Sequence, residues 1–221
     1  MVRQVEPGAA ADERGAFDVV AVATSLGGLL ALRAVLSQLP AEFPAAIIVV
    51  QHRQGAPHYE LSELLRARTK MAVKEAVEGE PLAPGTVYVA PAGEHVTVDA
   101  AGALRLDSSE RVNFVRPSAD VLFASVAAAF GPRAIGVVLT GALNDGAEGV
   151  RAIKAARGRV VVQDEASSVA FGMPRAALAT GCVDFVLPLE CIASALVTLV
   201  MVRGAADLFK VPVASWAHMK A

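Results

Sequence analysis

The sequence predicts an α/β fold: a doubly wound, mostly parallel sheet with a β-hairpin insertion near one edge. Apolar runs of strand length alternate along the chain with segments whose apolar residues recur at helical spacing. One run, AAIIVV at 45–50, is apolar at every position, which is typical of a strand covered by helices on both faces. A length of 221 residues suits a single domain with one compact core.

The first half of the chain is expected to form a β-α-β-α-β unit. A β-branched run at 17–23 leads into a helix that Pro40 ends, and the strand at 45–50 follows. Pro57 opens a second helical stretch, and the alternating run at 71–77 is the third strand. The two crossovers favour a parallel arrangement of these strands.

Short strands and turn residues between Glu78 and Asp107 predict the hairpin insertion, built from runs at 87–91, 95–99 and 104–106. The second half returns to alternation. Its expected elements are a helix at 117–130, a strand at 134–141, a helix at 147–157 closed by Gly158, a strand at 160–163, a short helix near 174–180, a strand at 183–187 and a final helix from Leu189.

Residues 17–204 are expected to form the folded domain, with a disordered N-terminal tail at 1–16 and a C-terminal tail at 205–221. The longest uncharged run at the C-terminal end, 191–202, is too short to span a bilayer, so we expect no membrane insertion. The charged residues of the first tail are the opposite of a secretory signal.

Charge and cysteine usage exclude several classes of protein. The net charge is −2 and the basic residues are scattered, so no nucleic-acid surface is expected. The two cysteines, Cys182 and Cys191, have neither metal-ligand spacing nor the density of a disulfide scaffold. These features favour a cytoplasmic protein without a metal site.

Three polar side chains follow strands of the expected sheet. Ser25 comes after the first strand, His52 after the second, and Asp145 lies in the loop after the strand at 134–141. The carboxyl ends of parallel strands share one edge, where reactive side chains collect. A serine hydroxyl needs a base to become a nucleophile, and the base needs an orienting carboxylate. The sequence therefore predicts a triad of these three residues.

The turn after Ser25 has the features of an oxyanion site. A helix is expected to begin there, and its dipole favours negative charge near the N–H groups of Leu26 and Gly27. Gly27 and Gly28 leave room for a bulky substrate. Two other interpretations stay open on these residues alone: Ser25 is an ordinary helix cap, or the turn binds phosphate, although G-x-G-x-x-G and the P-loop lysine are absent.

Other residues compete for the roles of base and orienting acid. His58 falls at a helix start, His95 begins a hairpin strand and His218 lies in the C-terminal tail, so a structural or solvated role is expected for each. Asp164 and Glu165 also follow a strand, where hydrogen bonding to loop backbone is the ordinary role.

From about Val19 to Leu199 the chain resembles the catalytic domain of the chemotaxis protein-glutamate methylesterases. The segments that carry the resemblance are ATSLGG at 23–28, QH at 51–52, VKEAVEGEPLAPGTVYVAP at 73–91, RPSADVLFASVA at 116–127, LTGALNDGA at 139–147 and QDEASSVAFGMPRAA at 163–177. Ordered agreement over such widely separated segments is specific to a family.

The resemblance implies a serine hydrolase without a cofactor, with Ser25 as nucleophile, His52 as general base and acid, and Asp145 as the acid that orients the histidine. It places an oxyanion and substrate loop at Leu26, Gly27, Gly28 and Ala142. The implied reaction is hydrolysis of γ-glutamyl methyl esters to glutamate and methanol, with deamidation of glutamine in some members. The implied partner is the cytoplasmic helical bundle of methylated chemoreceptors, or another protein substrate.

The sequence departs from the family pattern at Ala23, which replaces glycine, at Leu26, which replaces threonine, and at Ala142-Leu143, which replaces methionine-glycine. Leu26 removes a hydroxyl but keeps its backbone N–H. These changes leave two alternatives open, a hydrolase of a different ester or a catalytically weak relative that acts as a protein-binding module. The sixteen residues before Phe17 cannot encode the receiver domain that usually precedes the family's catalytic domain, so a stand-alone domain is expected.

Overall fold

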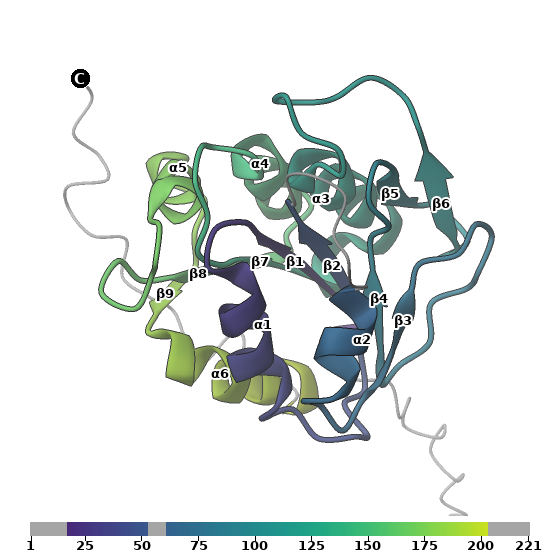
Figure 1. Cartoon of the computed structure of the whole chain (residues 1–221). Helices are drawn as coiled ribbons and strands as arrows, with labels where there is room; N and C mark the ends of the chain where they lie inside the picture. Colours follow the sequence, from purple (N-terminus) through teal and green to yellow (C-terminus); the bar gives the residue numbers. More distant parts are fainter. Residues whose placement is uncertain (1–16, 53–60, 203–221) are drawn as a thin grey trace, which may run out of the picture.

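A seven-stranded parallel sheet forms the centre of the molecule, and a small antiparallel hairpin accompanies it (Figure 1). The computed structural model describes residues 17–52 and 61–202. The strands of the sheet are β1 (Val19–Thr24), β2 (Ala46–Gln51), β3 (Ala72–Glu75), β4 (Thr86–Val89), β7 (Ala134–Val138), β8 (Arg159–Gln163) and β9 (Phe185–Leu187). They lie in the order β3-β4-β2-β1-β7-β8-β9, which confirms the predicted fold class.

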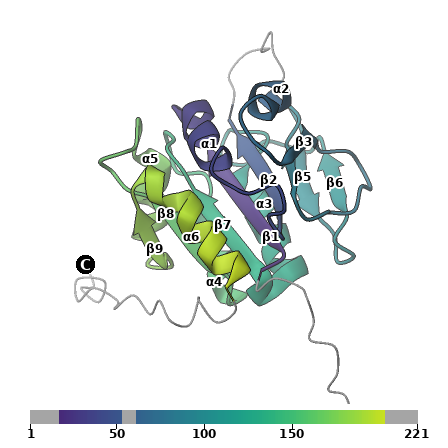
Figure 2. The ribbon, with the colours of Figure 1, turned by 90° about the horizontal axis from the view of Figure 1, so that it is seen from below.

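Helices cover both faces of this sheet, so the molecule has three layers (Figure 2). One face carries α1 (Gly28–Leu36), α2 (Leu61–Arg66) and α6 (Leu189–Met201), and the other carries α3 (Ala119–Phe130), α4 (Ala147–Ala155) and α5 (Gly172–Ala179). A 3-10 turn at Gly131–Arg133 joins α3 to β7. None of the helices within the described ranges has the length and apolar content that crossing a membrane requires.

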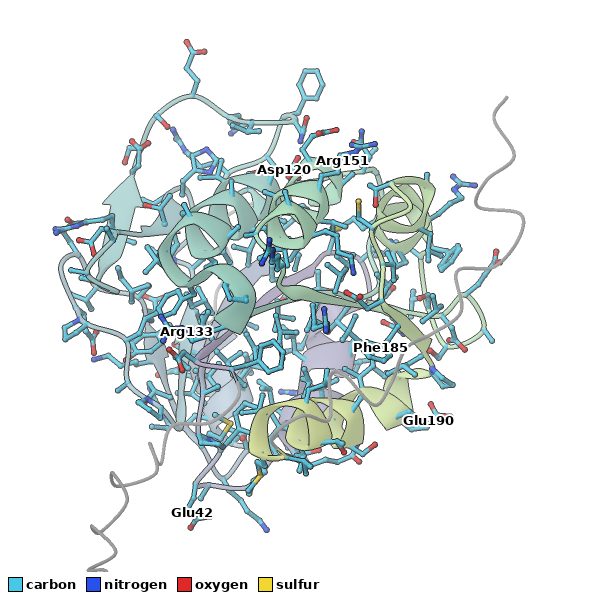
Figure 3. All side chains as sticks on the ribbon, turned by 180° about the vertical axis from the view of Figure 1, so that it is seen from behind. Glu42, Asp120, Arg133, Arg151, Phe185 and Glu190 are labelled. Atoms are coloured by element: carbon cyan, nitrogen blue, oxygen red, sulfur yellow. The ribbon has the colours of Figure 1, made fainter. Side chains whose placement is uncertain are left out.

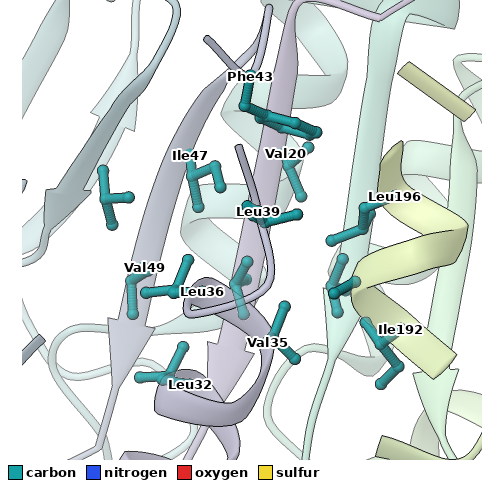
Figure 4. Close-up of a cluster of buried hydrophobic side chains, with 14 of the residues drawn as sticks. Val20, Leu32, Val35, Leu36, Leu39, Phe43, Ile47, Val49, Ile192 and Leu196 are labelled. Carbon is teal, nitrogen blue, oxygen red and sulfur yellow. The ribbon is translucent and has the colours of Figure 1, made fainter. Parts of the chain in front are cut away.

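Alternate residues of each central strand enter different halves of the core. Val20 and Ile47 pack with α1 and α6 on one side of the sheet (Figure 4). Their neighbours Ala21 and Ile48 pack with Phe123 of α3 on the other side. Both faces are therefore buried, which is why the run at 45–50 contains no polar residue. Each large aliphatic side chain buried in this way stabilises the fold by about 1.5–3 kcal/mol.

The run at 87–91 has a different place from the one the sequence predicted. It forms β4, which pairs in parallel with β2 and β3 inside the main sheet. Val87, Tyr88 and Val89 are all buried, as expected for a strand covered on both faces. Its short length and the turn residues around it make it look like part of a hairpin. Only β5 (His95–Val98) and β6 (Leu104–Asp107) form the hairpin, as a separate sheet whose apolar residues pack with α3.

The end of α4 also differs in detail from the prediction. The left-handed residue that closes the helix is Arg157, with φ 65°, and not Gly158. The N–H of Gly158 donates to Ile153 O at 2.9 Å. A Cβ at Gly158 would lie 2.7 Å from Ala134 O, so glycine is needed here for close approach to β7 rather than for the cap.

The order of the strands creates a crevice at the carboxyl ends of β1, β2 and β7. After β1 the chain builds β2, β3 and β4 on one side, then crosses to build β7, β8 and β9 on the other. β1 is therefore the point where the direction of winding reverses, the usual position of a binding crevice in such sheets. Thr24 is in register with Gln51, and Ala23 with Val138, so the three loops begin side by side. The predicted tails, 1–16 and 205–221, lie outside the described residues.

We predict that Gly149→Ala destabilises the protein by about 1–3 kcal/mol, because a side chain there overpacks the contact between α3 and α4. The added Cβ would lie 2.5 Å from Phe123 Cβ. Gly136→Ala in β7 is the matched control, since its nearest neighbour would be 3.4 Å away. Urea unfolding measures both, and equal stabilities of the two variants would contradict the packing argument.

Candidate active site

Two side chains of the predicted triad, His52 and Asp145, are hydrogen-bonded to each other, and the third, Ser25, lines the same pocket as His52. Ser25 follows β1 and His52 follows β2, and both line one pocket of about 760 Å³. Asp145, in the loop between β7 and α4, lies under this pocket with 2% of its surface exposed. Its Oδ2 is 2.8 Å from Nε2 of His52. Three loops far apart in the sequence therefore bring a hydroxyl, an imidazole and a carboxylate to the same crevice.

Ser25 is held by its backbone, and its hydroxyl is left unused by the turn. The N–H of Ser25 donates to Thr140 O at 3.0 Å, and Ser25 O accepts from the N–H of Gly28 at 2.9 Å. The cap residue of α1 is Gly27, with φ 82°, and not Ser25. The Ser25 hydroxyl makes no hydrogen bond to any residue that the structure describes. The helix-cap interpretation of this serine therefore does not apply.

The two glycines after Leu26 have different roles. A Cβ at Gly27 would lie 2.7 Å from Val169 Cβ, so the turn fits against the loop after β8 only without a side chain. A Cβ at Gly28 would collide with the side chain of Thr24. Gly27 lines the pocket, whereas Gly28 does not. Gly28 thus has a packing role at the start of α1.

Three backbone N–H groups at the pocket are available to a ligand. The N–H groups of Leu26, Gly27 and Ala142 have no partner within 17–52 and 61–202, and all three residues line the pocket. The Ala142 loop comes close to the serine because Gly141 precedes it. A Cβ at Gly141 would lie 3.0 Å from Ser25 Cβ and would also collide with Met173. These N–H groups are candidate donors to an oxyanion beside the Ser25 hydroxyl.

The Asp145 carboxylate is surrounded by donors from α3. Ala119 N lies 2.6 Å from Oδ2, and Ser118 Oγ lies 2.7 Å from Oδ1. The N–H of Asp120 is 3.3 Å from the same Oδ1. The N-terminus of a helix favours an anion because its first N–H groups are unpaired and its dipole is positive there. The carboxylate therefore caps α3 from another part of the chain.

These contacts determine the charge on Asp145 and the tautomer of His52. Burial acts to raise the pKa of Asp145, but the hydrogen bonds from His52, Ala119 and Ser118 outweigh it and lower the pKa below its ordinary value. The ionised carboxylate accepts the proton on His52 Nε2, which leaves Nδ1 as the basic nitrogen of the neutral ring.

Asp120 makes the reverse connection, from α3 to the start of α4. Its Oδ1 accepts the N–H of Gly149 at 2.7 Å, and its Oδ2 accepts Nδ2 of Asn113 at 2.7 Å. Asp120, labelled in the upper part of Figure 3, lies on α3, which packs against α4. Burial and the nearby charge of Asp145 raise its pKa above the ordinary value, against the lowering effect of the Gly149 N–H.

The competing candidates from the sequence have other places. His95 is buried; its Nε2 donates to Glu110 O at 3.0 Å and its Nδ1 accepts the N–H of Ser118, so it has a structural role. Asp164 binds Ser167 within its own loop, and Glu165 is exposed. His58 and His218 lie outside the described residues. Across the described ranges no three His, Cys, Asp or Glu side chains cluster as metal ligands would.

Comparison with known proteins identifies the family. The profile of the family described as CheB methylesterase matches residues 20–196, which include all three strand-end residues. The chain belongs to the CheB methylesterase family.

The match to individual family members is close over the catalytic region. The chain is 45% identical over 195 residues to "Protein-glutamate methylesterase/protein-glutamine glutaminase" of Moorella thermoacetica, covering 86% of this chain and 46% of the relative. It is 45% identical over 180 residues to "Protein-glutamate methylesterase FrzG" of Myxococcus xanthus, covering 81% and 54%. The chain thus spans about half the length of the curated relatives it matches.

The structure is similar to the crystal structure of the CheB methylesterase catalytic domain of Thermotoga maritima. The TM-score is 0.80 at 35% sequence identity, and the match covers 83% of this chain and 98% of that chain. The CheB methylesterase catalytic fold therefore accounts for nearly all of the described residues.

The segment that precedes α3 is part of the pocket but carries no pattern that predicts a site. Residues of this segment line one side of the pocket, namely Arg111, Phe114, Val115 and Arg116. Ser118 was a recognisable signal, since serine just before a helix is a preferred cap residue. Its hydroxyl binds Asp145 rather than its own helix, a contact that no local pattern in the sequence encodes.

We predict that the carboxyls of Asp120 and Asp145 titrate on opposite sides of the ordinary aspartate value, with Asp120 above it. Asp145→Asn removes a negative charge beside Asp120 and so lowers the pKa of Asp120. Asp164→Asn, in a separate loop, is the control and leaves it unchanged. Carbon-detected NMR titration measures this, and an unchanged pKa of Asp120 in Asp145→Asn would refute the coupling.

The same two pKa shifts determine how the stability of the fold depends on pH. Because the pKa of Asp145 is lower in the folded chain, its ionisation stabilises the fold above the unfolded value of about 3.9. That stabilisation is lost as the pH falls through the folded value. The raised pKa of Asp120 acts in the opposite direction, because protonation at low pH relieves its burial.

Proposed function

We propose that this chain hydrolyses γ-methyl esters of glutamate residues in proteins, releasing glutamate and methanol, with Ser25 as nucleophile. The observation that carries the proposal is the 2.8 Å bond between His52 and Asp145 at a pocket that Ser25 also lines. The family and the names of the relatives support this reaction over hydrolysis of an unrelated ester.

In the first step the Ser25 hydroxyl attacks the ester carbonyl and gives its proton to Nδ1 of His52. This nitrogen is the acceptor because Nε2 donates to Asp145. The ring then carries a positive charge, and the buried carboxylate stabilises it. The lowered pKa of Asp145 keeps that carboxylate ionised near neutral pH.

The carbonyl oxygen becomes an oxyanion in this step and needs donors. The free N–H groups of Leu26, Gly27 and Ala142 lie around the pocket, and α1 contributes the positive end of its dipole. Removal of one such donor typically slows an acyl-transfer enzyme by about 10²–10³-fold. The replacement of threonine by leucine at position 26 keeps the backbone donor.

The second step completes the hydrolysis with protein groups and water. His52 returns its proton to the departing methoxide, which leaves as methanol, and the glutamyl group remains as an ester on Ser25. A water molecule then attacks this ester while His52 takes one of its protons. The same imidazolium protonates Ser25 as the glutamate leaves. The cycle ends with the triad in its starting state.

The expected substrates are methylated proteins of the chemosensory type, in particular the cytoplasmic helical bundle of a chemoreceptor. The name of the Moorella relative also includes protein-glutamine glutaminase. Deamidation of glutamine uses the same acyl-enzyme with ammonia as the leaving group, so we propose it as a second reaction of this site. A cytoplasmic location follows from this substrate.

Ser25→Ala should abolish methanol release from a methylated receptor, with a loss of about 10⁴-fold or more, because the nucleophile is removed. Ser194→Ala, on the exposed side of α6, is the control and keeps full activity. A fluorophosphonate probe should label the wild type and Ser194→Ala but not Ser25→Ala. Failure of the wild type to label or to release methanol would favour the protein-binding module.

Asp145→Asn should lower kcat by about 10⁴-fold, because the neutral amide no longer stabilises the positive charge that forms on His52. The variant keeps an acceptor oxygen for the N–H of Ala119, so its circular dichroism spectrum should match the wild type. Asp164→Asn is again the control. A decrease below tenfold in Asp145→Asn would contradict this role of the carboxylate.

A further inference from the structure

Large apolar side chains surround the mouth of the pocket and remain exposed. Leu26 is 59% exposed, Leu143 is 68% exposed and Phe114 is 91% exposed. All three line the same pocket as Ser25 and His52. Single exposed apolar residues are common, but a group of them around a pocket marks a binding surface. We call these three residues the apolar rim.

Backbone strain is concentrated at the apolar rim. Within the described ranges, four residues other than glycine have positive φ: Asn113, Phe114, Leu143 and Arg157. Phe114 and Leu143 both have φ 66°. A large side chain in this conformation costs about 1–2 kcal/mol, and such residues persist where the surrounding structure holds them. Three of the four lie at the pocket mouth or next to it.

Hydrogen bonds of the neighbouring residues hold the turn that carries Phe114, and one of them reaches Asp145 of the triad. Val112 and Val115 exchange backbone hydrogen bonds of 3.2 and 3.0 Å, so Asn113 and Phe114 form the tip of a tight turn. Nδ2 of Asn113 lies 2.7 Å from Oδ2 of Asp120 and 3.4 Å from Oδ1 of Asp145. The turn that carries Phe114 is therefore tied to the acid that orients His52.

Leu143 is held by close packing on the other side of the pocket. A Cβ at Gly172 would lie 2.7 Å from Leu143 N and 2.9 Å from Leu143 O, so the backbone of α5 lies directly against this loop. A rim held in place before binding loses little conformational freedom when a ligand arrives. Both sides of the rim are thus suited to a specific contact.

The positive charge of the pocket indicates which charged residues a bound protein segment contains. Arg111 and Arg116 line it, and no carboxylate is among the described residues that line it. Nη1 of Arg116 is bound to the carbonyl oxygens of Ser108 and Ser109, which fixes this cation beside the mouth. A segment rich in acidic residues complements this charge, and a basic one is repelled.

We propose that the apolar rim binds an apolar side chain next to the esterified glutamate, so that this chain selects acidic protein segments with a leucine-like residue beside the ester. The inference rests on the proposed function, because it describes the substrate of the same site. It assigns recognition to Phe114 and Leu143, which take no part in the proton transfers. Burial of one such side chain against the rim corresponds to about a tenfold gain in affinity.

Binding to Ser25→Ala tests the rim without catalysis. The probes are two fluorescein-labelled acidic peptides that contain one γ-methyl glutamate, flanked by leucine in one and by serine in the other. Fluorescence polarisation should show about tenfold tighter binding of the leucine peptide. Adding Phe114→Asn should remove this difference, and asparagine tolerates positive φ, so the turn is kept. Val186→Asn, on exposed β9, is the matched control and should retain it.

Equal affinities of Ser25→Ala for the two peptides would overturn the proposal, as would loss of discrimination in the Val186→Asn control. Methanol release by the wild type from both peptides with the same kcat/KM would contradict recognition by the apolar rim but would leave the proposed hydrolysis in place. If the two peptides bind with different affinities but neither releases methanol, recognition by the apolar rim is supported and the proposed hydrolysis is contradicted. Preference for an uncharged lipophilic ester over the leucine peptide would assign the rim to a small molecule and contradict the proposal.

Discussion

The carboxylate of Asp145 at the N-terminus of α3 is the contact on which the site depends. A buried carboxylate without partners costs several kcal/mol, and each charge-assisted hydrogen bond recovers about 1.5–3 kcal/mol. Asp145 obtains its donors from α3, while Asp120 of α3 accepts the N–H of Gly149 in α4. The N-terminus of α3 is thus capped by an acid from the loop before α4, and the first turn of α4 is bound by an acid from α3. Removing either acid leaves unpaired N–H groups at a buried helix end.

A second connection fixes the serine relative to this pair of helices. Thr140 O accepts both the hydroxyl of Thr24 at 2.7 Å and the N–H of Ser25 at 3.0 Å. The hydroxyl of Thr140 donates to Leu26 O at 2.9 Å and accepts the N–H of Ala170 at 2.9 Å. One buried residue therefore joins the turn after β1 to the loops after β7 and β8. Ser25 is thus held by the segment that follows β7, and the same segment contains Asp145.

The sequence predicts those parts of the site that follow from repeating patterns. Ser25 and His52 could be predicted to lie at one pocket because apolar runs locate the ends of strands, and the carboxyl ends of parallel strands meet at one edge. The place of β4 was not predicted because a four-residue strand between turn residues carries too little pattern to separate it from a hairpin. The segment before α3 has no periodicity, and its key contacts, such as Ser118 with Asp145, join residues far apart in the chain. Such contacts depend on tertiary structure that no local pattern records.

The turn proposed to recognise the substrate is held by the same carboxylates that organise the triad. Asn113 bonds to Asp120 and reaches Asp145, and its neighbour Phe114 stands at the pocket mouth. The strain in this turn is therefore opposed by hydrogen bonds to the same carboxylates that organise α3, α4 and His52. The backbone that carries Phe114 is thus held by hydrogen bonds on both sides of the turn. Because interactions at a fixed surface cost little ordering on binding, the position of the ester relative to Ser25 is set when the neighbouring side chain binds.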